Sequence, residues 1–184
     1  MNPIETLKNE HGLIRRFLDN LAVAAEKIEA GQYPPREFFE RGVEFARLFA
    51  DRFHHFKEEH VLFMHLAQKH KGEIDGRIET LRFQHERGRE LVKTMAAALD
   101  GYAAGNEIKI AELLESTAAY VSLLRRHIHI EDHVLYPMAS EELTAAEMEA
   151  VAAEFDKERE RHGHDTFETA HKLVVDMGSM LVHF

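Results

Sequence analysis

The segment RHIHIEDHVLYPM, residues 126–138, places an imidazole and a carboxylate on one face of a predicted helix. His127 and Glu131 are four residues apart, so on a helix they stack one turn above the other. An unpaired buried charge is strongly unfavourable, so this pair needs a cation, a proton or an opposite charge. A second pair with the same spacing, His55 and Glu59, lies earlier in the chain. Two such pairs directed inward indicate a metal site. The face around the first pair is otherwise apolar or aromatic, with Tyr120, Leu124, Val134 and Met138.

Composition narrows the chemistry and the partners that this chain can have. Its 184 residues are most simply one domain, and they include no cysteine, which excludes disulfides, thiolate metal sites and cysteine nucleophiles. The net charge of −10 is spread along the chain, so no nucleic-acid partner is expected. No apolar run approaches the roughly 20 residues that span a bilayer, and the N-terminus lacks a signal-peptide pattern. We therefore expect a cytoplasmic protein without a membrane partner, and the sequence leaves open a homo-oligomer.

Long periodic segments separated by glycine and proline predict an all-α fold. Four helices with short connections favour an up-down-up-down four-helix bundle over about residues 1–140. Thr144 and Glu147 have the spacing of a capping box, which predicts an additional C-terminal helix over about residues 144–182 of the same domain, 1–184. The inward stripe expected on the second helix is Phe45, Leu48, Arg52, His55, Glu59, Leu62 and Leu66.

Six polar groups on the inward stripes lie at similar distances from the predicted helix breaks. In an antiparallel bundle they therefore fall in one layer. A single histidine on an apolar face is more often an ordinary core histidine, and His-x-x-x-Glu pairs also occur on solvated faces. Four imidazoles and two carboxylates in one layer, however, would make a poor core without a cation. The predicted ligands are His11, His55, Glu59, His85, His127 and Glu131.

The predicted ligand types indicate which metal the site holds. Imidazole and carboxylate without thiolate suit iron, manganese or zinc. Six ligands are too many for one tetrahedral zinc, so we expect two iron ions, with manganese or zinc as alternatives. Glu58, beside Glu59, and His164, on the apolar stripe of the C-terminal helix, are additional candidate ligands. His54 flanks the predicted ligands. Six further histidines are expected at the surface, namely His60, His65, His70, His129, His133 and His183.

The ordered motifs resemble those of the hemerythrin-like (HHE cation-binding) proteins. The resemblance rests on Glu-His at 10–11, His-Phe-Lys-Glu-Glu at 55–59, His85, and His-Ile-His-Ile-Glu-Asp at 127–132. The sequences EEHVLF at 58–63 and EDHVLYPM at 131–138 strengthen it. The resemblance covers about the first 140 residues and implies a non-haem di-iron site in a four-helix bundle that binds oxygen or related small molecules.

The chain departs from the oxygen-carrier pattern of that family at two places. The carrier pattern has His-x-x-x-His on the third helix, whereas Arg89 follows His85 at that spacing. On the fourth helix the inward stripe selects Glu131 rather than Asp132. One imidazole fewer and more acidic ligands favour redox turnover or sensing over reversible oxygen carriage.

The resemblance implies a protein that binds or reacts with oxygen, peroxide or nitric oxide, in sensing, detoxification or iron handling. It leaves open whether the protein is an enzyme. An iron–sulfur cluster repair protein is one alternative, but such proteins commonly carry an N-terminal extension with cysteine, and this chain has no cysteine. A metal-free helical interaction module is the other alternative.

Overall fold

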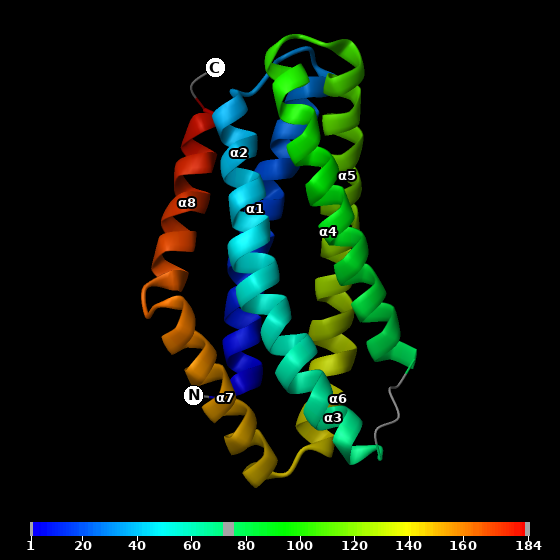
Figure 1. Cartoon of the computed structure of the whole chain (residues 1–184), viewed down its shortest axis with the longest axis vertical. Coiled ribbons are helices and arrows are strands. Elements are labelled where there is room, and N and C mark those ends of the chain that lie inside the picture. The colour runs from blue at the N-terminus through cyan, green and yellow to red at the C-terminus, as the bar shows by residue number, and fades with distance from the viewer. Residues whose placement is uncertain (1, 72–75, 183–184) are drawn as a thin grey trace.

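The computed structural model describes residues 2–71 and 76–182, and these residues form helices and short connections without a β-strand. Four long antiparallel helices form a bundle, and two further helices run along one side of it (Figure 1). The predicted all-α four-helix bundle is therefore confirmed. None of the described helices is long and apolar enough to cross a membrane. His183 lies outside the described residues.

Two of the four bundle helices change their winding part-way along. The first and third bundle helices are regular α-helices, whereas the second and fourth each contain π-helical segments, labelled η. The first bundle helix is α1 (Pro3–Glu29), and the third is α4 (Gly76–Ala103). The second is one continuous helix made of α2 (Arg36–Phe45), η1 (Ala46–His55), η2 (Glu58–Leu62) and α3 (Phe63–Lys69). The fourth is made of α5 (Glu107–Ile130), η3 (Glu131–Leu135) and α6 (Tyr136–Glu142).

The helix ends follow local sequence signals. Asn2 accepts a hydrogen bond from the Ile4 amide at 2.9 Å, and proline occupies the first turn of α1. Gly31, at φ +74°, lies in the turn after α1, where a left-handed backbone suits glycine. Asn106 caps α5 through its side chain. These polar caps satisfy amide groups that would otherwise have no partner in the helix.

The π-helical segments shift the inward faces away from the regular spacing that the sequence predicts. Leu48 and Val134 were expected inside, but their exposed fractions are 47% and 41%. A π-helix bonds residue i to residue i+5, so each turn is wider and later positions rotate onto the inner face. Leu135 and Tyr136 are buried where a regular helix would bury Val134. The predicted stripes were therefore wrong at these positions.

A polar layer divides the bundle interior into two apolar clusters. The larger cluster contains Phe17, Phe45 and Leu124, and the smaller one contains Leu7 and Leu62. Between them every bundle helix contributes buried polar side chains, namely Glu10, His11, His54, His55, Lys57, Glu58, His85, His127 and Glu131. Because the apolar clusters hold the helices together on both sides, this layer has a rigid frame.

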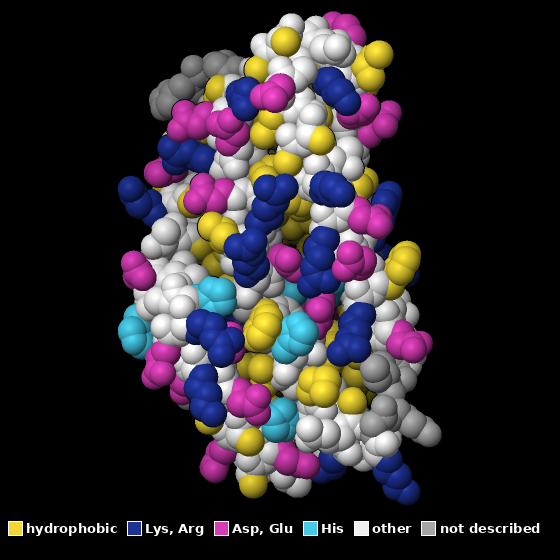
Figure 2. All heavy atoms as spheres, in the orientation of Figure 1, with side chains coloured by type: hydrophobic (Ala, Val, Ile, Leu, Met, Phe, Trp, Pro, Cys, Tyr) yellow, Lys and Arg dark blue, Asp and Glu magenta, His cyan; other side chains and the backbone are white. Residues whose placement is uncertain are grey.

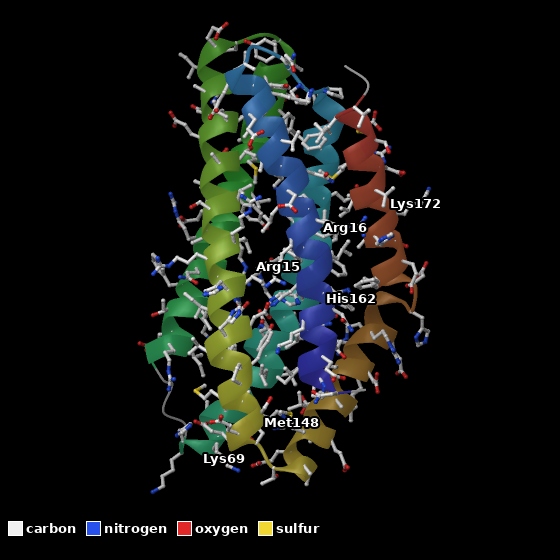
Figure 3. All side chains as sticks on the ribbon, turned by 180° about the vertical axis from the view of Figure 1, so that it is seen from behind. Arg15, Arg16, Lys69, Met148, His162 and Lys172 are labelled. Atoms are coloured by element: carbon white, nitrogen blue, oxygen red, sulfur yellow. The ribbon has the colours of Figure 1, made fainter. Side chains whose placement is uncertain are left out.

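The C-terminal segment folds as two helices, α7 (Ala145–His162) and α8 (Thr166–Met180). The predicted capping box of Thr144 and Glu147 starts α7. Gly163, at φ +104°, divides the single helix that the sequence predicts. Seen from behind, Arg15 extends toward the α5 side and Arg16 toward α8 (Figure 3), where Arg16 Nη1 lies 3.0 Å from His171 Nε2.

Gly88 offers a test of the packing beside the polar layer. A Cβ atom added to it would lie 3.6 Å from Leu124 and Tyr120, an ordinary van der Waals contact. Alanine is favoured over glycine inside a helix, so we expect Gly88→Ala to raise the free energy of unfolding by roughly 0.5–1 kcal/mol. Urea denaturation measures this change. Gly12→Ala, with open space around the new methyl group, is the matched control. A lower free energy of unfolding in Gly88→Ala, without the same decrease in Gly12→Ala, would contradict this packing.

Candidate metal centre

Seven buried side chains form two groups that could each hold a metal ion, and the two groups share Glu58. Within each group the four candidate ligand atoms lie within 4.8 Å of one another. Five imidazoles and two carboxylates thus converge in the polar layer. The first group is His55, Glu58, His85 and His127, and the second is His11, His54, Glu58 and Glu131.

Both carboxylates reach toward both groups. Glu58 Oε2 lies 3.4 Å from His85 Nε2 and 3.7 Å from His54 Nε2. Glu131 Oε2 lies 3.2 Å from His11 Nε2, while its Oε1 lies 3.0 Å from His127 Nε2. Each carboxylate therefore stands between the two groups, an arrangement suited to bridging two cations.

Most of the imidazoles use their outer nitrogen in a hydrogen bond to a second residue. Such partners fix the ring orientation and leave the inner nitrogen free to bind a metal. The Nδ1 atoms donate to Asp132 (from His11, 2.9 Å), Glu10 (from His54, 2.8 Å), Glu59 (from His85, 2.6 Å) and Gln84 (from His127, 2.9 Å). His55 Nδ1 lies 3.5 Å from Asp51, and the His55 ring stacks on the His85 ring with centroids 3.8 Å apart.

Several atoms that point into this layer lack hydrogen-bond partners, as is expected where a metal ion binds. His54 Nε2, Glu58 Oε2 and both Glu131 oxygens are buried and have no hydrogen-bond partner among the described residues. The Nε2 atoms of His85 and His127 face each other at 2.9 Å. Since their Nδ1 atoms carry protons, these Nε2 atoms present lone pairs to each other, which requires a proton or a cation nearby. Imidazoles with carboxylates suit iron, manganese or zinc, so the residues fit such a metal.

The comparisons with known proteins agree with this geometry. The model of the hemerythrin HHE cation binding domain matches residues 2–139, which include all seven side chains. The chain belongs to the hemerythrin HHE family. Relatives with 29% identity over 178 residues are "Uncharacterized protein Rv1995" of Mycobacterium tuberculosis (strain ATCC 25618 / H37Rv) and "Uncharacterized protein Mb2018" of Mycobacterium bovis (strain ATCC BAA-935 / AF2122/97). Each alignment covers 96% of this chain and 69% of the relative. No solved structure matches the chain.

The second helix of this hemerythrin domain contributes a different carboxylate from the one that regular spacing selects. Glu59 belongs to neither group: its Oε1 accepts from His85 Nδ1 at 2.6 Å and from Arg89 Nη2 at 2.9 Å. Glu58 belongs to both groups. The structure brings together the other five predicted ligands and Glu58, and it places Glu59 behind His85 as a hydrogen-bond acceptor.

His54 is the member of the two candidate metal groups that the sequence did not predict as a ligand. Two consecutive pairs, His54 with Glu58 and His55 with Glu59, have identical spacing, and a regular helix directs only one of them inward. The π-helical winding of η1 and η2 buries His54, His55 and Glu58 together. The fifth imidazole therefore comes from the second helix, and the expected loss of one imidazole is not found in the described structure.

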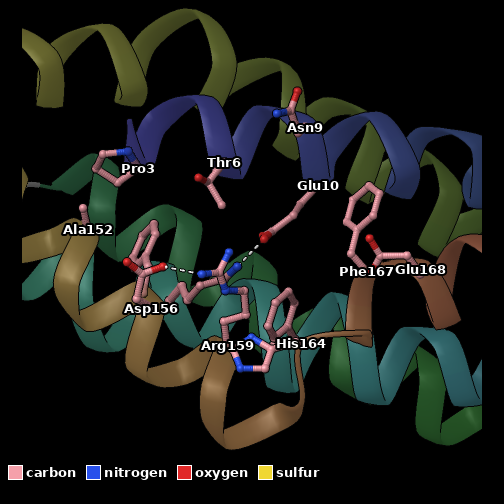
Figure 4. A pocket seen from close by; sticks show the side chains of 13 residues that line it. Pro3, Thr6, Asn9, Glu10, Ala152, Asp156, Arg159, His164, Phe167 and Glu168 are labelled. Atoms are coloured by element: carbon pink, nitrogen blue, oxygen red, sulfur yellow. Dashed lines mark hydrogen bonds and ion pairs between the residues drawn. The ribbon is translucent and has the colours of Figure 1, made fainter. Parts of the chain in front are cut away.

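His164 lies apart from the metal centre. It is exposed in the turn between α7 and α8, and it lines a cavity of about 250 Å³ with Glu10, Arg159 and Phe167 (Figure 4). It belongs to neither group of candidate ligands. The C-terminal helices therefore cover the bundle next to the centre, and in this structure they bring no imidazole into it.

Burial and neighbouring charges set opposite protonation preferences within the layer. Burial disfavours a charged His11, but the carboxylates of Asp132 and Glu131 outweigh it and raise the pKa of His11 to about 9. Burial, together with the adjacent His85, lowers the pKa of His55 to about 3. Although burial acts to raise the pKa of Glu131, His127 and His11 hold that pKa well below its usual range. Without metal, protons on imidazoles balance the carboxylates, so metal binding must release protons.

Tyr136 is a further residue of the layer that the sequence reasoning missed. Its hydroxyl donates to Glu58 Oε1 at 2.6 Å and lies 3.3 Å from His11 Nε2. The side chain is fully buried. The hydroxyl therefore orients the carboxylate that the two groups share, leaving Glu58 Oε2 unpaired and free to bind a cation.

Replacing this hydroxyl tests that role. We expect Tyr136→Phe to lower the free energy of unfolding of the metal-free protein by about 1–3 kcal/mol, because a buried carboxyl oxygen loses its partner. We also expect weaker metal binding, by roughly 10–100-fold, since partners of metal ligands have effects of this size. Chemical denaturation and competition with a chelator measure the two effects. Tyr102→Phe, which removes a hydroxyl bonded to the Pro34 carbonyl, is the control and should leave metal affinity unchanged. Equal metal affinities for wild type and Tyr136→Phe would exclude the positioning role.

Proposed function

We propose that this hemerythrin-family protein holds two iron ions in the polar layer and binds or reacts with oxygen, peroxide or nitric oxide. The observation that carries the proposal is the pair of carboxylates, Glu58 and Glu131, with unpaired buried oxygens between five imidazoles. Two cations at this place would satisfy all of these atoms at once. When bound, an iron pair supplies electrons and open coordination positions for small oxygen or nitrogen species.

The chain's own residues would prepare this centre in three ways. Asp132 and Glu10 accept hydrogen bonds from His11 and His54, which orients the inner nitrogens. Tyr136 orients Glu58. The apolar clusters above and below shield the layer from bulk water along the bundle axis, which strengthens electrostatic interactions within it.

The donor set supports iron over zinc, calcium and magnesium. Five imidazoles and two carboxylates exceed the four ligands of a structural zinc site, and the absence of cysteine excludes thiolate sites. Calcium and magnesium prefer oxygen ligands and would leave the imidazoles unused. Manganese suits the same donors as iron.

The proposal is tested by metal content and by ligand spectra on one preparation. We expect about two iron ions per chain and an absorption spectrum that changes when azide is added to the oxidised protein. After anaerobic reduction, oxygen, peroxide or nitric oxide should each be tested for a spectral change. One tightly bound zinc ion with rejection of iron would overturn the metal assignment. Two iron ions with no spectral response to any of these molecules would overturn the proposed reactivity.

A further inference from the structure

A second cavity opens onto the candidate metal centre from the side of the bundle. Its volume is about 310 Å³, and it lies between η1 and α4. His55 and His85, both members of the first metal group, form part of its wall. The cavity that His164 lines contains none of the seven side chains of the two groups. The cavity between η1 and α4 is therefore the one of these two that reaches imidazoles of the metal centre.

Positive side chains surround this cavity, although the whole chain has a net charge of −10. The space-filling view shows a hollow near the centre of this face, bordered by Lys and Arg side chains in dark blue (Figure 2). Asp51 is the acidic residue in the lining. The basic residues in the lining are Arg47, Arg52, Arg89 and Lys93.

Three of these cations are free to act on a solute. Arg89 is occupied, because its guanidinium pairs with Asp51 at 2.8 Å and with Glu59 at 2.9 Å. Arg47, Arg52 and Lys93 are exposed and have no ion pair with any described residue. Arg89 also pairs with Glu86 at 3.1 Å. The four basic side chains of the lining still outnumber its one carboxylate, Asp51, so the lining remains positive. A cleft lined by one sign of charge concentrates ions of the opposite sign and accelerates their arrival.

Next to the imidazoles, the cavity wall includes a glycine and a tyrosine. Gly88 contributes no side chain there, and Tyr120 forms another part of the wall. The Tyr120 hydroxyl makes no hydrogen bond to the described residues, so it is available to a molecule in the cavity.

We propose that the cavity between η1 and α4 is an access route that selects small inorganic monoanions, and that Arg47, Arg52 and Lys93 attract these anions toward the His55 and His85 side of the metal centre. The inference rests on the proposed function for its destination, but the positive cavity itself does not depend on iron. Neutral ligands such as nitric oxide gain nothing from these charges. The three cations therefore raise the association rate of anions and leave that of neutral molecules unchanged.

The test uses a triple variant, Arg47→Gln with Arg52→Gln and Lys93→Gln, in the iron-loaded protein. The control removes the same charge from exposed lysines on α1, α7 and α8, with Lys8→Gln, Lys157→Gln and Lys172→Gln. Stopped-flow absorption gives the association rate of azide with the oxidised protein and of nitric oxide with the reduced protein. At low ionic strength we expect the azide rate to fall at least ~10-fold in the cavity variant, since electrostatic steering changes rates by roughly 10–10³-fold. The difference should shrink at high salt, and the nitric oxide rate should stay unchanged.

The outcomes separate this inference from the proposed function. Equal azide rates for the cavity variant and the control would overturn the access route, even if both bind two iron ions. A parallel loss of the azide and nitric oxide rates would also overturn it, because damage to the centre rather than charge would explain the result. If the protein binds no iron, chloride-35 NMR line widths on the metal-free proteins decide instead. Less broadening in the cavity variant than in the control supports the positive site, and equal broadening refutes it.

Discussion

Removing the metal ions is expected to lower the melting temperature of this hemerythrin domain by roughly 10–20 °C. Each ion at a concentration about 100 times its Kd stabilises the folded state by about 2.7 kcal/mol, and two ions act together. For a chain of this size, 1 kcal/mol corresponds to roughly 2–4 °C. The physical cause is the polar layer, where buried oxygens of Glu58 and Glu131 lack hydrogen-bond partners that a bound cation would replace.

Calorimetry of metal-free and iron-loaded protein measures this effect, and iron added back should restore the higher melting temperature. Glu58→Gln serves as the control, because the variant lacks the carboxylate that both groups share. Its melting temperature should respond little to iron. Identical melting of metal-free and iron-loaded wild type would show that these residues do not hold the metal.

Glu58 and Glu59 should differ sharply in their effect on metal binding. Glutamine keeps the size of either side chain and removes only the charge. Because Glu58 lies in both groups, we expect Glu58→Gln to bind fewer than two iron ions per chain even at saturating iron. The Glu59 carboxylate accepts a hydrogen bond from His85 and belongs to neither group. We expect Glu59→Gln to retain two ions, with affinity reduced by roughly 10–100-fold.

Iron titration with elemental analysis of both variants gives the stoichiometry, and chelator competition gives the affinity. The two substitutions are adjacent in sequence and identical in chemistry, so general effects of the mutation cancel. If Glu59→Gln lost iron while Glu58→Gln retained it, the metal ligand would be Glu59, as regular α-helical spacing predicts. That result would contradict the π-helical register.

The sequence predicted the helices and the layer because both depend on local spacing. Helix caps such as Asn2 and Thr144 act within one turn, and the apolar period continues over many residues. The polar groups could be placed in one layer because antiparallel helices with short connections fix their relative heights. The choice of an all-α bundle therefore needed no information beyond the chain's own pattern.

Which of two neighbouring residues faces the bundle interior could not be predicted in this way. His54 and His55 differ by one position, and only the wider turns of η1 allow both to face inward. A π-helical segment is recognised by its i+5 hydrogen bonds, and no residue type in this stretch marks it. The winding depends on packing between helices, which is a property of the folded bundle.

Polar pairs between residues far apart in the chain could not be predicted from the sequence either. The sequence pattern gave no indication that Lys57 is buried and pairs with Glu10 of α1. Burial lowers the pKa of Lys57 and raises the pKa of Glu10, and their mutual attraction opposes both shifts. Glu10 also accepts from His54 at 2.8 Å, so this pair supports a candidate ligand. The two residues come from different helices, and their spacing carries no signal in a single sequence.

Anomalous diffraction from crystals of the iron-loaded protein, recorded on both sides of the iron absorption edge, tests the two-metal centre most directly. The account predicts two iron peaks, one among His55, His85 and His127 and the other beside His11 and His54, with Glu58 and Glu131 between them. One iron peak, or a peak bound by Glu59 in place of Glu58, would contradict it.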